Sequence, residues 1–191
     1  MKKLIAYSSV AHMGFVTLGI FTFTIYGFMG AMLQMLNHGI TTGALFLMVG
    51  IIYERTHSRQ IYDNAGLGKF MPAYVGFFGL FAVSSFAFPG TNSFVGELYV
   101  LISTFARSRT AGFFAVVGAV VAAAYMLKLL KQIVWGREDK RDIKDLNVRE
   151  FVYLTQLAIF VIWVGLFPAP FVRVMETTLV NLFMQLNKLS Q

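Results

Sequence analysis

The chain has 191 residues, of which 57% are hydrophobic and only 13% are charged, and its formal net charge is +7. Soluble domains average about 25% charged residues, so this composition excludes a soluble globular domain and indicates an integral membrane protein. The absence of cysteine excludes disulfides and thiolate metal sites. A basic chain can also bind nucleic acid, but here the basic residues lie mainly between apolar segments, so we expect no nucleic-acid partner.

The first apolar segment, residues 4–23, predicts a transmembrane helix, because about 20 helical residues cross the roughly 30 Å hydrocarbon core of a bilayer. Lys2 and Lys3 before an apolar segment are also typical of a signal peptide. His12 interrupts that segment, however, and no small-residue cleavage site follows it cleanly. We therefore predict a span that is retained.

A second apolar segment at residues 27–53 predicts a longer helix that is antiparallel to the first. Tyr26 and Gly27 leave room only for a very short turn, so the two helices must be neighbours. A polar and charged stretch at residues 54–59 ends the second helix.

The third segment, residues 72–106, predicts one discontinuous crossing, because it is too long for a straight span and too short for two spans with a loop. Within it, Pro89 lacks an N–H and Gly90 loosens the backbone, so this pair predicts a break. A new helix should then begin near Asn92 or Ser93. Broken helices at membrane depth occur where protein or water meets the freed backbone groups, so we expect a hydrated interior.

Two further apolar segments, residues 112–135 and 151–167, predict the fourth and fifth crossings. Lys128 and Lys131 lie near the end of the fourth and can extend to the membrane interface.

Residues 171–188 predict an amphipathic helix along the surface or against partners, because apolar residues recur at helical spacing with polar residues opposite. These apolar residues are Val172, Met175, Leu179, Leu182, Phe183 and Leu186. The predicted fold is thus an all-α integral membrane protein with about five crossings, one of them discontinuous. We expect a transmembrane bundle over residues 1–170 and a C-terminal amphipathic helix over residues 171–191.

The distribution of lysine and arginine predicts the orientation of the chain. With five crossings, one side of the membrane carries Lys2, Lys3, Arg55, Arg59, Lys69 and the basic residues from Lys131 to Arg149. The other side carries Arg107, Arg109, Arg173 and Lys188. The positive-inside rule therefore predicts a cytoplasmic N-terminus and a periplasmic C-terminus.

Glu97 is the acidic residue farthest from any predicted loop, since residues 72–88 and 98–106 on either side of it carry no charge. Insertion of an acid at the centre of a membrane helix costs roughly 2.5–3.5 kcal/mol, so such a residue is a candidate functional site. The alternative interpretation is a structural glutamate that is hydrogen-bonded to a neighbouring helix.

His12 and His38 lie near the middle of the first and second predicted spans, at the depth expected for Glu97. Polar residues stand three or four positions from each histidine on the same helix face: Ser8, Ser9, Gln34 and Thr42. Histidine exchanges a proton near physiological pH, and chains of His and Asp/Glu inside a bundle form proton relays. Each histidine alone is explained as well by a hydrogen bond between helices, but the three residues together predict a relay.

Several stretches of the chain resemble a known family. They are residues 2–14 with His12, Gln34 and Met35 with His38 and Gly39, residues 53–59, and residues 88–97 with Pro89, Gly90 and Glu97. The chain resembles the M-type chains of proton-pumping NADH-quinone oxidoreductase, respiratory complex I, whose mitochondrial counterpart is NADH dehydrogenase subunit four. The similarity covers nearly the whole chain.

This resemblance implies an antiporter-like membrane-arm subunit that contributes part of a proton pathway coupled to NADH:quinone oxidoreduction. Glu97 matches the family's acidic residue on a broken helix, where the sister L- and N-type chains usually carry lysine. His12 and His38 match two relay histidines, and Pro89-Gly90 matches the helix break.

The resemblance also implies partners and a location. NADH, FMN, iron–sulfur clusters and quinone are expected in partner subunits rather than in this chain, and the partners should include L- and N-type chains. The expected location is a bacterial inner membrane.

One departure from the family is large, because its members are much longer and this chain matches only their last part. We expect a split subunit or a truncated product, with a separate chain supplying the missing N-terminal helices. Lys128 also stands where an uncharged residue is expected. Two other functions stay open: a subunit of a multi-subunit cation/proton antiporter or membrane-bound hydrogenase, and a scaffold for assembly.

Overall fold

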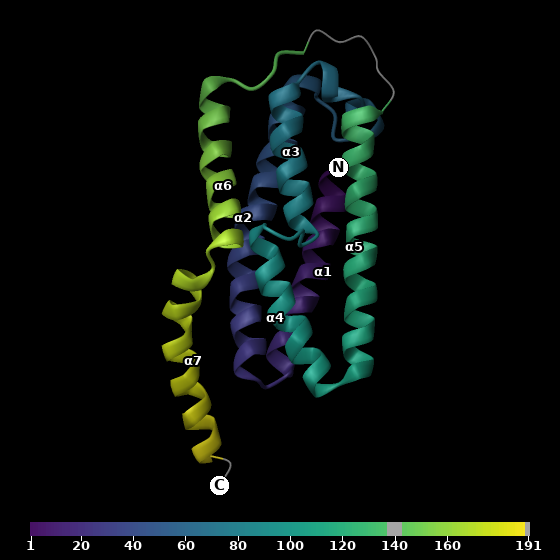
Figure 1. Ribbon diagram of the computed structural model, residues 1–191. Coiled ribbons are helices and arrows are strands. Elements are labelled where there is room, and N and C mark those ends of the chain that lie inside the picture. The colour runs from purple at the N-terminus through teal and green to yellow at the C-terminus, as the bar shows by residue number, and fades with distance from the viewer. Residues whose placement is uncertain (137–142, 190–191) are drawn as a thin grey trace.

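The computed structural model describes residues 1–136 and 143–189, with side chains as far as residue 185, and all regular structure in that part is helical (Figure 1). The elements are α1 (Lys2–Phe21), α2 (Ile25–Thr56), the short 3-10 helices η1 (Tyr62–Asn64) and η2 (Leu67–Lys69), α3 (Pro72–Ser85), α4 (Asn92–Arg107), α5 (Arg109–Trp135), α6 (Val148–Leu166) and α7 (Ala169–Leu189).

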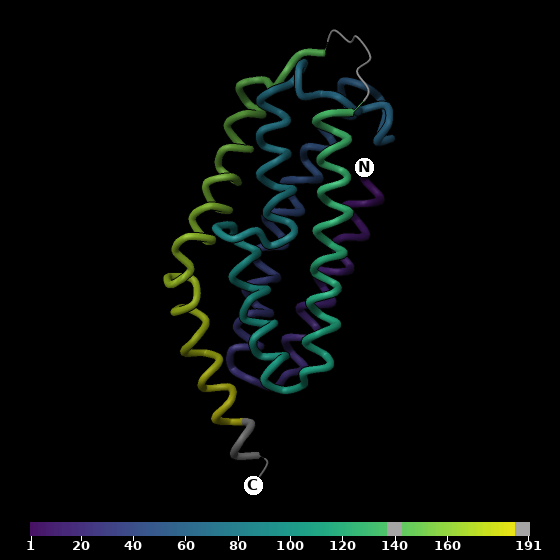
Figure 2. The backbone as a smooth tube through the Cα atoms, turned by 45° about the vertical axis from the view of Figure 1, so that its right-hand side comes forward, coloured from purple at the N-terminus to yellow at the C-terminus, as the bar shows by residue number. Residues whose placement is uncertain are grey.

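The predicted number of crossings is confirmed. By length and composition, α1, α2, α5 and α6 are each able to cross a membrane. Helices α3 and α4 have 14 and 16 residues, too few for a full crossing each. They lie end to end in the bundle, and their junction falls near mid-height in Figures 1 and 2. Placed end to end, these two helices correspond to the discontinuous crossing that the sequence predicts.

The turn between α1 and α2 lies at residues 22–24, slightly earlier than the predicted turn at Tyr26 and Gly27. Thr24 is the reason, because its hydroxyl accepts a hydrogen bond from the Gly27 N–H at 3.0 Å and caps α2. Phe23 takes a positive φ of 51° to complete the turn. A threonine cap therefore starts the helix before the glycine.

The break between α3 and α4 has the predicted form. Helix α4 begins at Asn92, and Gly90 has φ of 92°, a conformation that favours glycine. Helix α6 packs directly on the break, since a Cβ at Gly165 would collide with the Gly90 carbonyl. The freed backbone groups are therefore covered by protein on that side.

Helix α2 is the centre of the bundle and packs against α1, α3, α4, α6 and α7. Large apolar side chains fill the half of the bundle that contains α3, and they include Leu45, Met48, Tyr74, Phe78, Phe81 and Leu129, all fully buried. In the other half α2 and α4 approach closely at Gly30, where a Cβ would lie 2.8 Å from the Val100 nitrogen and 2.9 Å from the Gly96 oxygen.

A polar cluster closes the end of the bundle where α2 ends and α3 and α6 begin. Arg55 donates to both carboxylate oxygens of Glu150 and to the backbone oxygens of Lys144 and Asp145. The Asp145 carboxylate accepts hydrogen bonds from the Ala73 and Tyr74 N–H groups at 2.9 and 3.1 Å. The connection before α6 is thus fixed to both α2 and α3.

Helix α7 includes the predicted amphipathic segment and packs along α2. Leu179 is 4% exposed, and the Phe183 ring meets the Phe28 ring at a centroid distance of 5.3 Å. The N-terminus, the α2–α3 connection and the start of α6 lie toward one end of the bundle and the C-terminus toward the other (Figure 1). Residues 137–142 of the predicted basic stretch lie outside the described residues.

Candidate functional site

Glu97, His12 and Gln34 form a buried cluster where α1, α2 and α4 meet. His12 Nδ1 lies 3.3 Å from Glu97 Oε1, and Gln34 Nε2 donates to the same oxygen at 3.2 Å. Gln34 Nε2 is also 3.5 Å from His12 Nδ1. The exposed fractions are 4% for His12, 6% for Glu97 and 0% for Gln34, so bulk solvent does not surround the carboxyl group.

His38 extends this cluster along α2. Its ring centroid lies 5.3 Å from that of His12 with an interplanar angle of 45°, and its Nδ1 shares a 3.0 Å hydrogen bond with Thr42 Oγ1. His38 is half-buried. The structure therefore places Glu97, His12 and His38 in one continuous series.

The remaining predicted residues take different positions. Gln34, predicted beside His38 on α2, contacts His12 and Glu97 instead. Ser8 and Ser9 hydrogen-bond to the Ile5 oxygen of their own helix. Lys128 is exposed on α5.

Tyr125 on α5 was not predicted from the sequence. Its side chain interacts with that of Ser8 on α1.

A second buried network, also not predicted, lies at the helix break. Asn92 Oδ1 accepts from Ser84 Oγ at 2.6 Å and from Thr41 Oγ1 at 3.2 Å. Asn37 Nδ2 donates to the backbone oxygen of Asn92 at 2.7 Å. The sequence carried one signal for it, because Gln34, Asn37 and Thr41 follow at intervals of three and four residues on one face of α2.

The sequence forms these clusters because small residues let α2 and α4 approach. A Cβ at Gly96 would lie 2.8 Å from Gln34 Oε1 and 3.0 Å from the Gln34 nitrogen, so only glycine leaves this space. The close approach excludes bulk water and brings the amides of α2 against Glu97 and Asn92. Polar groups in such an interface must find partners within it.

Two side chains of the cluster, Glu97 and His12, can exchange a proton. No three His, Asp or Glu residues of the described chain are grouped as metal ligands. A carboxylate only accepts hydrogen bonds, whereas a neutral imidazole nitrogen donates or accepts according to its tautomer. The pair of His12 and Glu97 therefore contains a site for one exchangeable proton within hydrogen-bond reach.

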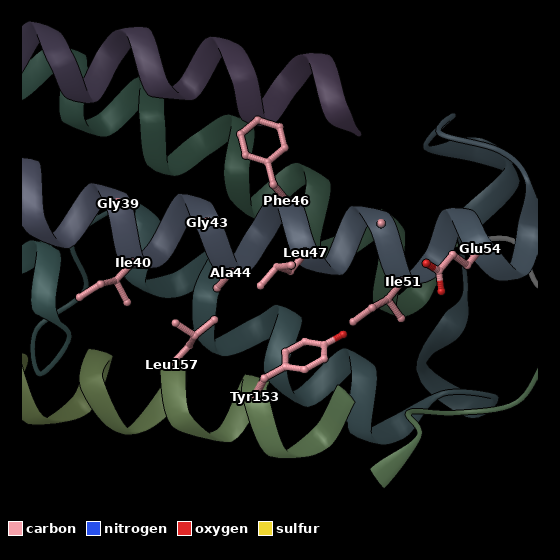
Figure 3. Close-up of a pocket in the computed structure, with 11 residues that line it drawn as sticks. Gly39, Ile40, Gly43, Ala44, Phe46, Leu47, Ile51, Glu54, Tyr153 and Leu157 are labelled. Carbon is pink, nitrogen blue, oxygen red and sulfur yellow. The ribbon is translucent and has the colours of Figure 1, made fainter. Parts of the chain in front are cut away.

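A separate groove of about 560 Å³ lies between α2 and α6 (Figure 3). It is lined by Gly39, Gly43, Ala44, Leu47, Tyr153 and Leu157, with Glu54 toward one end. A Cβ at Gly39, Gly43 or Gly50 would meet no atom within 4 Å, so this face of α2 is open. The groove is apolar over most of its length and does not contain Glu97 or His12.

These features define a helical membrane protein with a broken helix and a buried cluster of proton-exchanging side chains. Residues 1–122 match the family model described as NADH:quinone oxidoreductase/Mrp antiporter, TM. The chain belongs to this family.

Known relatives agree with this assignment. The chain is 42% identical over 185 residues to NADH-ubiquinone oxidoreductase chain 4 of Chondrus crispus, which covers 95% of this chain and 38% of the relative. The chain therefore spans well under half the length of such relatives.

Solved structures show the same fold. A chain of respiratory complex I from Thermus thermophilus with bound NADH superposes with a TM-score of 0.91 at 30% identity, covering 97% of this chain and 39% of that one. The Mrp complex from Dietzia superposes with a TM-score of 0.82 at 21% identity, covering 94% and 42%. At 21% identity, the likeness to the Mrp complex concerns the fold alone.

Proposed function

We propose that this chain carries protons through part of the membrane arm of a respiratory NADH:quinone oxidoreductase. The observation that supports this function best is the 3.3 Å contact between the buried Glu97 carboxyl and His12 Nδ1, continued by the His12–His38 ring contact. Ionisable residues are costly at membrane depth and are retained there for proton transfer.

In this mechanism Glu97 accepts a proton and passes it across the 3.3 Å contact to His12. His12 then passes it toward His38, directly or through one water molecule. Thr42 holds Nδ1 of His38 and so fixes the orientation of that ring. The half-buried position of His38 makes it the end of the series nearest the outer face of α2.

The helix break supplies the second part of the mechanism. Gly90 and Pro89 stop the helix beside the Asn92 network, at the junction of α3 and α4. This junction falls near mid-height of the bundle (Figure 1). Within this network, Asn37 Oδ1 has no donor among the described residues and could accept a hydrogen bond from a water molecule. Protons would reach Glu97 from this side.

The names of the relatives support the partners and the location of the chain. Redox chemistry would take place in other subunits, where NADH, FMN, iron–sulfur clusters and quinone bind, and this chain would carry no redox centre. L- and N-type chains would lie beside it. The N-terminal end of the bundle would face the cytoplasm of a bacterial cell and the C-terminal end its periplasm.

A cation/proton antiporter subunit is the second candidate, because the Dietzia Mrp complex shares the fold. Both functions use the same buried cluster. Copurification separates them, since flavin and iron–sulfur proteins would be recovered with a complex I subunit and only membrane chains with an antiporter.

The experiment that tests proton transfer is proton translocation per NADH oxidised, measured in vesicles with the assembled complex. Glu97→Gln should lower it strongly, because the amide cannot carry the proton. Glu176→Gln, at an exposed residue of α7, is the matched control and should leave it unchanged.

The histidines provide a second arm of the same experiment. His12→Leu and His38→Leu should slow the proton-transfer step by about 100-fold or more, whereas His57→Leu, at an exposed residue after α2, should have no effect. Full translocation in the Glu97, His12 and His38 variants would favour a scaffold role instead.

A further inference from the structure

Gln34 is the one member of the buried cluster that carries no exchangeable proton, and its amide is only partly used. Its Nε2 donates to Glu97 Oε1 at 3.2 Å and lies 3.5 Å from His12 Nδ1. Its Oε1 is buried and accepts no hydrogen bond from any described residue. Buried polar atoms without a partner are rare in folded proteins and call for an explanation.

We propose that the Gln34 amide reverses its orientation when Glu97 gains or loses its proton, so that Gln34 stays hydrogen-bonded to the carboxyl group in both states. This inference rests on the proposed function, in which Glu97 exchanges a proton. Gln34 is then a positioning residue: the orientation of its amide decides whether Glu97 and His12 face a hydrogen-bond donor or an acceptor.

The two states of Glu97 need opposite partners. A carboxylate is only an acceptor, and the observed Nε2 donor suits it. A protonated carboxyl has an O–H that donates. His12 Nδ1 is one acceptor within reach, but the NH₂ group of Gln34 cannot accept, so Gln34 can bind this state only through Oε1. A half-turn of the amide about its last side-chain bond brings Oε1 to the place of Nε2, and the two ends are nearly equal in size.

The site has room for both orientations. Gly96 leaves space around the Oε1 end of the Gln34 amide, because a Cβ at residue 96 would lie only 2.8 Å from Oε1. Asn37, one helical turn further along α2 on the same interface with α4, has a second buried oxygen, Oδ1, without a donor among the described residues. The face of α2 that carries Gln34 therefore also carries an unused acceptor, Asn37 Oδ1.

Reversal of the amide also changes what His12 can do. With Nε2 toward the cluster, His12 Nδ1 is favoured as an acceptor from Gln34, or it donates its own proton to Glu97. With Oε1 toward the cluster, a protonated Nδ1 gains a second acceptor. The amide thus links the protonation of Glu97 to the tautomer of His12, which is the next carrier in the series.

The test is infrared difference spectroscopy of the assembled complex, with glutamine labelled with carbon-13 at the side-chain carbonyl. Spectra are compared between the conditions in which Glu97 is ionised and protonated. The labelled carbonyl band should shift between the two states, and the shift should be lost in Gln34→Met. Gln156→Met, the same change at an exposed residue of α6, should leave it intact.

Two results overturn the proposal: a labelled band that does not move while the Glu97 carboxyl band changes, and a shift that survives in Gln34→Met. If Gln34→Met does not assemble, Glu97→Leu replaces it, and the shift must then be absent. The two proposals fail separately. Normal proton translocation in Glu97→Gln contradicts the proposed function, whereas impaired translocation with an immobile labelled band contradicts only the role of Gln34.

Discussion

Asn92 is the first residue of α4 and connects three helices through its side chain and backbone. Ser84 and Thr41 donate to its Oδ1, and Asn37 donates to its backbone oxygen. Its own Nδ2 donates to the Asn37 oxygen at 3.3 Å. All four side chains are at most 2% exposed, so water cannot replace a lost partner easily.

Asn92→Leu should therefore lower the free energy of unfolding by about 3 kcal/mol, because it leaves the hydroxyls of Ser84 and Thr41 without their acceptor. Thermal unfolding in detergent measures the change. Asn181→Leu, on an exposed face of α7, is the control and should alter the midpoint little. An equal effect of both variants would contradict the role given to the network.

At the same scale, sequence reasoning identified the ionisable residues of the candidate site but not all of their partners. Glu97, His12 and His38 stand out because ionisable residues are rare inside apolar segments. Asn37, Thr41, Ser84 and Asn92 do not stand out singly, since uncharged polar residues are common in membrane helices. Their network depends on how α2, α3 and α4 meet, and that geometry cannot be read from one helix.

Among the elements, the contact of α2 with α4 depends on glycines that carry no polar function. Gly30→Ala should lower the free energy of unfolding by about 1–3 kcal/mol, because its Cβ would lie 2.8 Å from the Val100 nitrogen. Gly118→Ala on α5 is a suitable control, since its Cβ would meet no atom within 4 Å. There the substitution should be neutral or slightly stabilising. The same loss at both positions would show that close packing is not the cause.

The end of α2 is held to the start of α6 by Arg55. Arg55→Ala removes the hydrogen bonds to Glu150 and to the Lys144 and Asp145 oxygens, and it should cost about 2 kcal/mol or more. If these hydrogen bonds hold the connection before α6 in place, their loss should make that connection more sensitive to proteolysis, which limited proteolysis measures. Arg107→Ala, at an exposed residue of α4, should not change it. Unchanged proteolysis in Arg55→Ala would contradict the proposed fixation.

The helices themselves were predictable, because a span of about 20 apolar residues has few alternatives in a membrane. The break at Pro89 and Gly90 was predictable for a local reason, since proline removes a hydrogen bond that the helix needs. The turn before α2 was misplaced by a few residues because the cap at Thr24 depends on one hydroxyl. The packing of α6 on the break at Gly165 had no signal in the sequence that distinguished it from other glycines.

At the scale of the whole molecule, the groove between α2 and α6 suggests where the rest of the assembly packs. The chain spans 38% of the length of its Chondrus relative, and the open face of α2 carries Gly39, Gly43 and Gly50. Small residues let another transmembrane helix approach closely. A transmembrane helix from the rest of the assembly suits this groove.

A single cysteine tests this contact, because the chain contains none. Gly43→Cys should react with a maleimide when the chain is isolated in detergent and should be protected at least tenfold in the assembled complex. Tyr62→Cys, at a residue that is 82% exposed, is the control and should react in both. Equal reactivity of the Gly43 variant in both preparations would contradict a helix over the groove.

The central claim is that the buried Glu97 carboxyl takes up and releases a proton in each turnover. Time-resolved infrared spectroscopy of the assembled complex during NADH oxidation tests it most directly, through the carbonyl band of the protonated acid. A band that appears and decays with turnover in the native complex and is absent in Glu97→Gln is the predicted result. A Glu97 carboxyl that keeps one protonation state throughout turnover would contradict the account.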